Sequence, residues 1–540
     1  MPEYLSPGVY IEEIEIGGKP IEGVSTSTAG FLGKTERGPI TPRLVTGFED
    51  FRRVFGYYID DSFLPFAIDG FFRNGGQRCF VGRIVRIKDQ DSTKNASVVN
   101  TASSSLEIEA IGPGSWGTRV AFKIEDASLK DSKPDYFKLT VMYWEKVPPV
   151  ASGKPKIDPT SSKPEDRKSP DRREPTILEP FDNLSMDPNS PDYFKKRVNG
   201  ISNLIQLDAV VGQETKRPTN VGLAMLADPA NKPEQFDGAS TVTAADYEGN
   251  ATPITVDGEI VFERSGLKGF KYVDEINIVC APDDHLYDDL YDKIVDHCED
   301  PELRDRFAIL QSKQEADPST IGTGLRPPRD SKYAAFYYPW IKVVDPRNNR
   351  NKLIPPGGHI AGIYARSDTE RGVHKAPANE IVKGARSVQF TINKAQQDIL
   401  NPMGVNAIRE FPGRGIRVWG ARTTSTDPLW KYINVRRLFL FLEESIDEST
   451  QWVVFEPNNE QLWARIKQTI TAFLITVWRT GALMGTTPDE AFFVKVDRTT
   501  MTQDDIENGR LIVTIGVAPT KPAEFVIFRF TQFTAGAEVA

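Results

Sequence analysis

Short segments of this 540-residue chain carry residues that could bind a nucleotide, act as a nucleophile or hold a metal. Gly33-Lys34-Thr35 ends like a phosphate-binding loop, in which glycine-rich backbone amides, a lysine and a hydroxyl hold phosphate and magnesium. The first glycine of that pattern would fall at residue 28, which is Thr28. The segment therefore indicates a strand that enters a turn at Gly38-Pro39, and no nucleotide cofactor is expected.

One serine segment has the outline of a nucleophilic site. Ser115 in the GPGSWG segment resembles a nucleophile elbow, but Pro113 stands where an elbow needs glycine, so a β-turn is predicted. Neither His359 nor His374 has a nearby arrangement of Ser, Cys and Asp that indicates a catalytic triad. We therefore assign no catalytic residue.

A metal site on a helix needs two ligands on one face, three or four residues apart. His285 and His297 are twelve residues apart and only Cys298 adjoins them, so we interpret His297 as a residue near a helix C-terminus. The pairs Asp283-Asp284 and Asp288-Asp289 are typical of a solvated first helical turn. No metal site is predicted.

The elements that would position these residues alternate between strands and helices from Val261 onward, which predicts a layered sheet with helices packed against it. The expected strands are Glu275–Asp284, Arg306–Ser312, Tyr333–Val343, Ala491–Val496 and Arg510–Ala518, the last two antiparallel. The expected helices are His285–Asp300, Pro356–Gly372, Val435–Ser445 and the amphipathic Trp463–Leu483.

The middle of the chain has a β-rich pattern, with alternating apolar residues in Leu106–Ile111, Thr118–Ile124 and Tyr136–Trp144. Lys154–Pro175 is rich in proline and mixed charge and has no apolar periodicity, which predicts a solvated loop. A basic docking tract is the alternative, but acidic residues interrupt the basic ones at Asp158, Glu165, Asp166 and Asp171.

Both ends of the sequence carry strand-like apolar runs, where globular domains usually have polar tails. Such runs expose unpaired edges that pair with another sheet, and pairing with a neighbouring copy would join subunits into an open polymer. We therefore expect inter-subunit arms whose contact residues are Val9, Tyr10, Ile11, Ile14 and Ile16 at the N-terminal end and Phe525, Val526, Ile527, Phe528 and Phe530 at the C-terminal end.

Several segments, in order and spacing, resemble the tail sheath proteins of contractile phages and phage-derived injection particles. They are YLSPGVYIEEI near the start, STAGFLGKTERGP (27–39), FRNGGQRCFVGRIV (72–85), KAPAN (375–379) and GVAPTKPAEFVIFRF (516–530). The resemblance runs nearly end to end and is thinnest between about 90 and 263, where only GPGSWGTRV (112–120) matches.

The resemblance implies a multidomain α+β or α/β fold: a layered core of mixed sheets with packed helices, a β-rich outward insertion, and extended arms that add strands to neighbouring subunits. It places the N-terminal arm at 1–22, the core at 23–95 and 264–518, the insertion at 96–263 and the C-terminal arm at 519–540. The implied function is that of a structural, non-enzymatic sheath subunit, which contracts to drive an inner tube through a target envelope.

The implied partners are further copies of the chain in stacked hexameric rings, the inner tube protein, and baseplate and terminal cap proteins. A net charge of −9 gives no basic footprint for nucleic acid. Three cysteines without CxxC spacing fit a reducing compartment. With no apolar span for direct membrane insertion, we expect production in the bacterial cytoplasm and then a place in a virion or an extracellular tail-like particle.

Two other functions remain open from the sequence. A non-contractile tube or surface polymer would use the same strand exchange without a change in length. An enzyme built on the α/β region is the third possibility, and a ligand screen on residues 261–518 would detect it.

Overall fold

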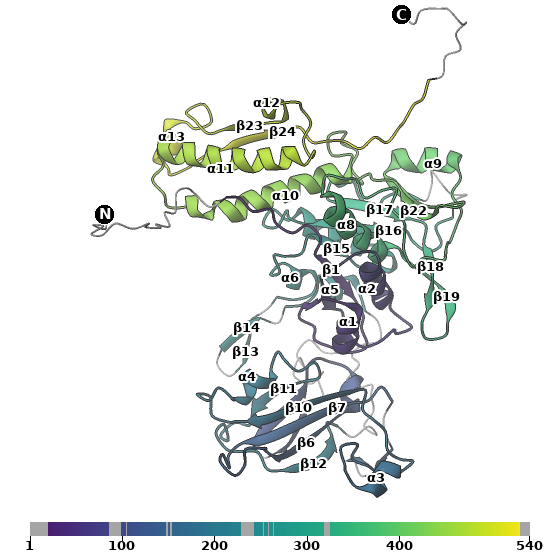
Figure 1. Cartoon of the computed structure of the whole chain (residues 1–540), viewed down its shortest axis with the longest axis vertical. Coiled ribbons are helices and arrows are strands. Elements are labelled where there is room, and N and C mark those ends of the chain that lie inside the picture. The colour runs from purple at the N-terminus through teal and green to yellow at the C-terminus, as the bar shows by residue number, and fades with distance from the viewer. Residues whose placement is uncertain are drawn as a thin grey trace, which may run out of the picture. The chain divides into compact units, whose positions relative to one another are not determined.

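The computed structural model describes residues 20–85, 99–103, 105–146, 149–151, 154–227, 242–251, 253–256, 259–262, 264–317 and 325–529. The chain forms a mixed α+β structure (Figure 1). It divides into two units. The larger unit comprises residues 26–370 and 377–433. The described part of the smaller unit comprises residues 20–25, 371–376 and 434–529.

An eight-stranded sheet forms the centre of the larger unit. Every residue of its four central strands is buried, which explains their nearly continuous apolar sequences. The pairings from β3 to β21 are parallel, and β2 and β22 pair antiparallel at the two edges. The spatial order is β2 (Arg43–Val45), β3 (Cys79–Arg83), β1 (Ala29–Gly33), β15 (Ile278–Cys280), β16 (Phe307–Gln311), β17 (Ala334–Tyr338), β21 (Val405–Phe411) and β22 (Gly415–Trp419).

Helices cover both faces of this sheet. A Cβ atom on Gly30 would lie 2.7 Å from the ring of Phe270, in α6 (Gly266–Phe270). The ring of the next strand residue, Phe31, contacts Phe71 of α2 (Leu64–Arg73), with ring centroids 5.3 Å apart. Because successive side chains of a strand point to opposite faces, α6 and α2 lie on opposite sides of the sheet.

Two helices of the larger unit pack unusually close together. A Cβ on Gly358 of α8 (Gly357–Arg371) would lie 2.3 Å from the backbone of Ala67 in α2, and one on Gly362 would lie 2.4 Å from the Phe71 carbonyl oxygen. Apart from the β-rich middle of the chain, the further helices of this unit are α1 (Phe48–Phe55), α5 (Ala244–Glu248), α7 (Leu290–Glu299) and α9 (Lys394–Leu400). Its further small sheets have the order β19 (Arg350–Ile354), β18 (Ile341–Asp345), β20 (Ser387–Val388), and β13 (Pro253–Val256) with β14 (Glu259–Phe262).

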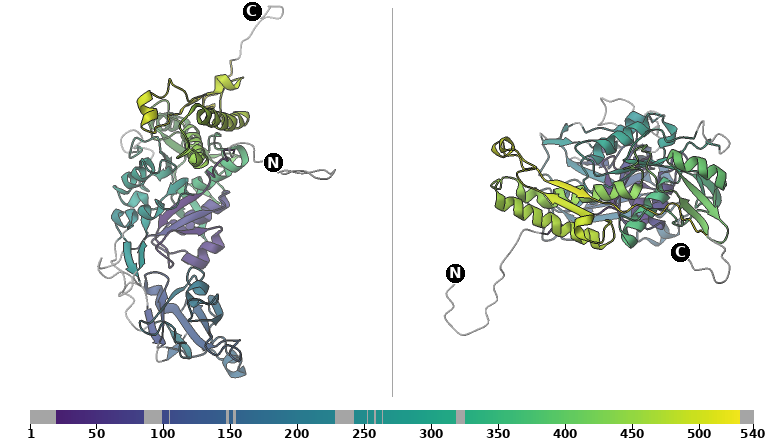
Figure 2. Two further views of the ribbon diagram at one scale, coloured as in Figure 1. Left: turned by 90° about the vertical axis from the view of Figure 1, so that its left-hand side faces the viewer. Right: turned by 90° about the horizontal axis from the view of Figure 1, so that it is seen from above.

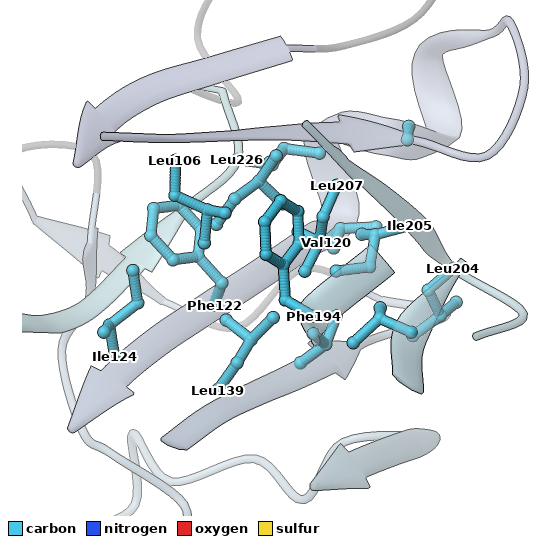
Figure 3. Close-up of a cluster of buried hydrophobic side chains, with 14 of the residues drawn as sticks. Leu106, Val120, Phe122, Ile124, Leu139, Phe194, Leu204, Ile205, Leu207 and Leu226 are labelled. Carbon is cyan, nitrogen blue, oxygen red and sulfur yellow. The ribbon is translucent and has the colours of Figure 1, made fainter. Parts of the chain in front are cut away.

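The β-rich middle of the chain folds as two small antiparallel sheets around their own hydrophobic core. Figure 3 shows side chains from both sheets meeting there, among them Leu106, Phe122 and Leu207. One sheet has the order β10 (Ile177–Leu184), β7 (Phe137–Tyr143), β6 (Val120–Asp126), β12 (Val221–Met225), and the other β11 (Ile205–Ala209), β5 (Leu106–Ala110), β4 (Val99–Ser103). Short flanking elements are α4 (Phe194–Val198), β8 (Val150–Ala151), β9 (Lys154–Pro155) and α3 (Pro164–Lys168).

A polar clamp, formed by Glu36, Arg119 and Tyr143, joins this middle region to the segment after β1. One carboxylate oxygen of Glu36 accepts hydrogen bonds from Arg119 Nη2 at 2.9 Å and from the Tyr143 hydroxyl at 3.0 Å. The other accepts from the Tyr57 amide at 2.9 Å. Burial acts to raise the pKa of Glu36, but the Tyr57 amide and Arg119 outweigh it and lower that pKa. The Glu36 carboxylate therefore stays ionised, and both of its oxygens accept hydrogen bonds.

The smaller unit consists of two long helices and a two-stranded sheet. α10 (Ile433–Thr450) and α11 (Glu460–Arg479) lie side by side in both sets of views (Figures 1 and 2), and Phe441 contacts Phe473 across them. Asn459 caps α11 by accepting a hydrogen bond from the Leu462 amide at 3.0 Å. The remaining elements are α12 (Pro488–Ala491), β23 (Phe492–Lys495), α13 (Gln503–Glu507) and β24 (Thr514–Val517).

Most predicted elements are present, but three expectations need correction. The strand predicted over 333–343 is two strands, because Pro339 cannot donate to a ladder and β18 joins a different sheet. The helix predicted from His285 begins at Leu290, after a 3₁₀ turn at Asp284–Leu286. The segment 154–175, expected as a loop, contains α3 and β9, although most of its residues are exposed.

Candidate functional site

The lysine of Gly33-Lys34-Thr35 does not lie in a phosphate cradle. Lys34 follows β1 and forms an ion pair with Asp61 at 3.2 Å. The Thr35 hydroxyl, which would face magnesium in a phosphate-binding loop, donates to the Arg37 carbonyl at 2.8 Å. The predicted strand is confirmed as β1, and the chain bends after it at Glu36 and Arg37. Gly38 has a φ of 107°, which favours glycine.

The histidines and cysteines singled out by the sequence are core residues. His285, His297 and His359 are all less than a tenth exposed, and the three cysteines are buried free thiols. His297 Nε2 lies 3.0 Å from Nη1 of Arg306, within the packing of α7. No cluster of three potential metal ligands occurs among the residues described in the structure. Ser115 begins a 3₁₀ turn, Ser115–Arg119, rather than a nucleophile elbow.

The prediction that Asp283 and Asp284 are solvated is wrong. Both lie at the carboxyl end of β15 and are at most 1% exposed. Asp284 accepts hydrogen bonds from the amide and the side-chain nitrogen of Gln311, at 3.2 and 3.1 Å, and Asp283 accepts from the Tyr247 hydroxyl at 3.1 Å. Burial raises the pKa of Asp283 to about 6, against the Tyr247 hydrogen bond and the nearby Lys34, and also raises the pKa of Asp284.

We expect Asp283→Asn to stabilise the protein above pH 6. The pKa of Asp283 is near 6 in the native state and 3.8 is its ordinary value. Between these two pH values the native state therefore binds more protons than the unfolded state. The free energy of unfolding consequently falls as pH rises through this window. Removing the charge should raise that free energy at pH 7.5 by up to about 3 kcal/mol. Urea unfolding from pH 4 to 8 measures it, with exposed Asp131→Asn as the control. An unchanged slope in Asp283→Asn would contradict the assignment.

The surface feature that the sequence did predict lies at the C-terminal end. Phe525, Val526, Ile527 and Phe528 are 72%, 68%, 76% and 77% exposed, although side chains of these types are normally buried. We call Phe525–Phe528 the apolar C-terminal segment. Residues 521–529 adopt neither helix nor strand. Contiguous exposed apolar side chains are typical of surfaces that bind a partner.

The chain is held firmly immediately before this segment. The Ala518 and Thr520 amides donate to the carbonyl oxygens of Ala491 and Ala482, at 2.9 and 3.0 Å. The Asn434 side chain donates to the Thr520 carbonyl oxygen at 3.1 Å. The apolar C-terminal segment therefore leaves the smaller unit from a fixed point.

The same unit carries a sheet with open edges. β23 and β24 pair only with each other among the described strands, and β23 contacts α11. Gly516 leaves room for the half-exposed ring of Phe493, because a Cβ there would lie 2.2 Å from it. Two-stranded sheets are marginally stable on their own and gain from added strands.

The structure describes only some of the arm residues predicted from the sequence. Phe525, Val526, Ile527 and Phe528 form one exposed run, and their pairing with another chain stays a prediction. Other predicted arm residues lie outside the described part of the chain, namely Val9, Tyr10, Ile11, Ile14, Ile16 and Phe530. The edges of β23 and β24 were not singled out from the sequence, since an open edge becomes apparent only when the pairing is known.

None of the described helices is both long enough and apolar enough to cross a membrane. This agrees with the polar interruptions that the sequence places along α11 at Arg465, Lys467 and Gln468.

Comparisons with known proteins agree on one family. Residues 240–424 match the family model of the phage tail sheath protein central domain, and residues 425–533 match that of the phage tail sheath C-terminal domain. The tail sheath protein of Vibrio phage KVP40 is 28% identical over 200 residues, which are 36% of this chain and 29% of that protein. The chain thus matches less than two thirds of this relative's length.

The fold also matches solved sheath structures. The sheath of the anti-feeding prophage in its contracted state is 24% identical with a TM-score of 0.55, covering 97% of this chain and 99% of that one. The contracted sheath complex of the extracellular contractile injection system PVC is 20% identical with a TM-score of 0.55, covering 98% and 99%. Since the two family models together cover residues 240–533, more than half of the sequence, the chain belongs to the phage tail sheath protein family.

Proposed function

We propose that this chain is the structural subunit of a contractile sheath, which polymerises around an inner tube and shortens to drive that tube through a target envelope. The observation that carries the proposal is the apolar C-terminal segment, four large apolar side chains exposed in succession on a chain of the sheath family. A soluble monomer has no use for such a surface, whereas a polymer buries it between subunits.

The apolar C-terminal segment adds, in this proposal, to an open edge of the β23–β24 sheet of a neighbouring subunit. Strand addition supplies main-chain hydrogen bonds, and the alternating side chains supply specificity. The N-terminal run from Val9 to Ile16 would pair alongside the added segment, at the same edge of the sheet. Two arms on each subunit then connect it to more than one neighbour, as a continuous lattice requires.

Contraction would exchange one packing of rigid bodies for another while the arms keep neighbours attached. The free energy would come from additional burial between subunits in the short form, with kinetic trapping holding the long form. In this arrangement the arms are 1–22 and 519–540, the core is 23–95 with 264–518, and the insertion 96–263 faces outward. The partners would be the inner tube, baseplate and terminal cap proteins, and no enzymatic step is required.

Cryo-electron microscopy of the purified particle before and after triggering tests this function. Two helical lattices of different length built from this chain would support a contractile sheath, whereas a single length under all triggers would favour the alternative, a static tube. Cysteines introduced at Ile11 and Ile527 should form disulfides between different subunits. The three native cysteines are buried, so background reaction should be low. Disulfides formed only within one chain would contradict strand exchange.

A further prediction concerns the charged loop of the insertion. Replacing residues 161–169 with a Gly-Ser linker of equal length should leave assembly and contraction unchanged, because most of these side chains are exposed. The replacement also spares Asp158, which bonds Lys123, and Arg173, whose carbonyl oxygen accepts from Trp144 Nε1. Sheath length in negative-stain images, before and after triggering, measures the effect. Loss of contraction would place this loop in a subunit contact.

A further inference from the structure

A polar pocket of about 520 Å³ lies in the larger unit. It is lined by one face of α2, the β18–β19 hairpin, the start of α8 and the loop 384–386. Its ionisable lining residues are Asp69, Arg73, His359 and Arg386. None of these residues has a role in the strand exchange proposed above.

His359 directs one ring nitrogen toward the pocket. Its Nδ1 is buried without a hydrogen-bond partner and packs against Gly70, where a Cβ would lie 2.2 Å away. Its Nε2 lies on the pocket side, 3.6 Å from the position of a Cβ on Gly384. A buried N–H without an acceptor is less tolerable than an unpaired lone pair. The proton therefore belongs on Nε2, which becomes a donor facing the pocket.

Two arginines supply further donors. Arg73 donates from Nε to the Asp69 carboxylate at 2.8 Å, and this ion pair offsets the Asp69 charge. The two terminal nitrogens of Arg73 can then donate to an anion in the pocket. Arg386 is exposed, and its guanidinium makes no hydrogen bond or ion pair to the residues that the structure describes. Burial, reinforced by the charge of Arg73, holds the pKa of His359 near 3, so its ring stays neutral at ordinary pH.

The pocket is held in place by its surroundings. Asn74, at the end of α2, donates to the Lys383 carbonyl oxygen at 3.0 Å and accepts from the Lys383 amide at 2.9 Å. The Arg386 amide donates to the Lys342 carbonyl oxygen of β18 at 2.8 Å. Gly384 has a φ of 89° and no side chain to fill the space between Arg73 and His359. A rigid frame of this kind lets donors bind without reorganisation.

We propose that this pocket binds an oxyanion, a phosphate or carboxylate group, through the side chains of Arg73, Arg386 and His359. Guanidinium groups match the geometry of both anions, and charge-assisted hydrogen bonds are the strong ones in proteins. Apolar side chains also line the pocket, among them Phe66 and Val343, and they would shield a bound anion from water. The anion is either a free ion or an acidic side chain of a second copy of this chain.

Calorimetric titration of the full-length soluble chain with inorganic phosphate, and separately with glutarate, tests the site at constant ionic strength. We expect one ion per chain for at least one of these probes. Arg386→Gln should weaken its binding at least about tenfold, since it removes a charge-assisted partner from an exposed position that folding does not need. Arg350→Gln, an exposed arginine of β19 outside the pocket lining, is the matched control and should bind like the wild type.

His359→Phe keeps a ring against Gly70 and removes the donor, so it should weaken binding as well. Absence of saturable binding for both probes, or equal binding by the wild type and Arg386→Gln, would overturn the proposal. This solution experiment does not depend on sheath assembly.

Assembled particles distinguish a free anion from a carboxylate of a neighbouring subunit. This second experiment rests on the proposed function. If a neighbouring subunit's carboxylate fills the pocket, assembly should reduce the phosphate bound per chain and Arg386→Gln should assemble less readily. If the anion is a free ion, the amount bound per chain should be the same before and after assembly.

Discussion

Ile527→Pro should abolish ordered sheath while leaving a folded, soluble subunit. Proline removes the backbone donor at the middle of the apolar C-terminal segment and fixes φ near −65°, so a strand added to another sheet loses a ladder hydrogen bond. Ile527 itself is 76% exposed in the isolated chain, so its replacement removes no core packing. Negative-stain images should contain no sheaths, and circular dichroism and thermal unfolding should match the wild type.

A second proline substitution provides the control. Val211 is 89% exposed and follows Val210, whose carbonyl oxygen accepts the Gln213 amide in a turn at 2.9 Å. Proline is favoured at this position of a turn, so Val211→Pro should fold and assemble normally. If Ile527→Pro subunits form sheaths that extend and contract like the wild type, the apolar C-terminal segment is not a connection between subunits.

Gly358→Val should destabilise the larger unit by about 3 kcal/mol or more. The first atom of any side chain at this position would lie 2.3 Å from the backbone of Ala67, so α8 and α2 would have to separate. The change also acts on a helix that supplies His359 to the anion pocket. We expect a lower urea midpoint and a sharp loss of soluble protein.

The same exchange at Gly222 tests whether the effect arises from helix packing. Gly222 lies in β12, and no atom within 4 Å would meet a Cβ there. Valine is also favoured in strands, so Gly222→Val should be neutral within about 0.5 kcal/mol. Equal loss of stability in the two variants would mean that the α2–α8 approach is not the cause.

Local patterns predicted the elements that depend on local physics. The apolar spacing of Leu462, Ile466, Ile470 and Phe473 predicted α11, and these residues form its buried face. The run at Phe525–Phe528 was singled out because strand-like apolar residues stand where polar tails are usual; its side chains are exposed, and its pairing with another subunit stays a prediction. The resemblance to tail sheath proteins, based on ordered short motifs, is confirmed by the family comparison.

What the sequence did not predict depends on contacts between distant residues. Asp283 and Asp284 follow a strand and precede a helix, a pattern shared with solvated caps. Their partners lie on distant segments, since Gln311 of the neighbouring strand donates to Asp284 and the Tyr247 hydroxyl donates to Asp283. The anion pocket likewise combines four separate segments of the chain. The division of the chain at Ile433/Asn434 coincides with no change in composition, because α10 begins there without a linker.

The clamp at Glu36 has a practical consequence for anyone who wishes to display a foreign domain on such a particle. A graft that removed Arg119 or Tyr143 would leave the partly buried carboxylate of Glu36 short of donors and would loosen the host. A graft at residues 161–169 leaves every side chain of the clamp in place. In the proposed arrangement, the outward insertion would offer an attachment site for a foreign domain, with its base held by Glu36 and its charged loop replaced.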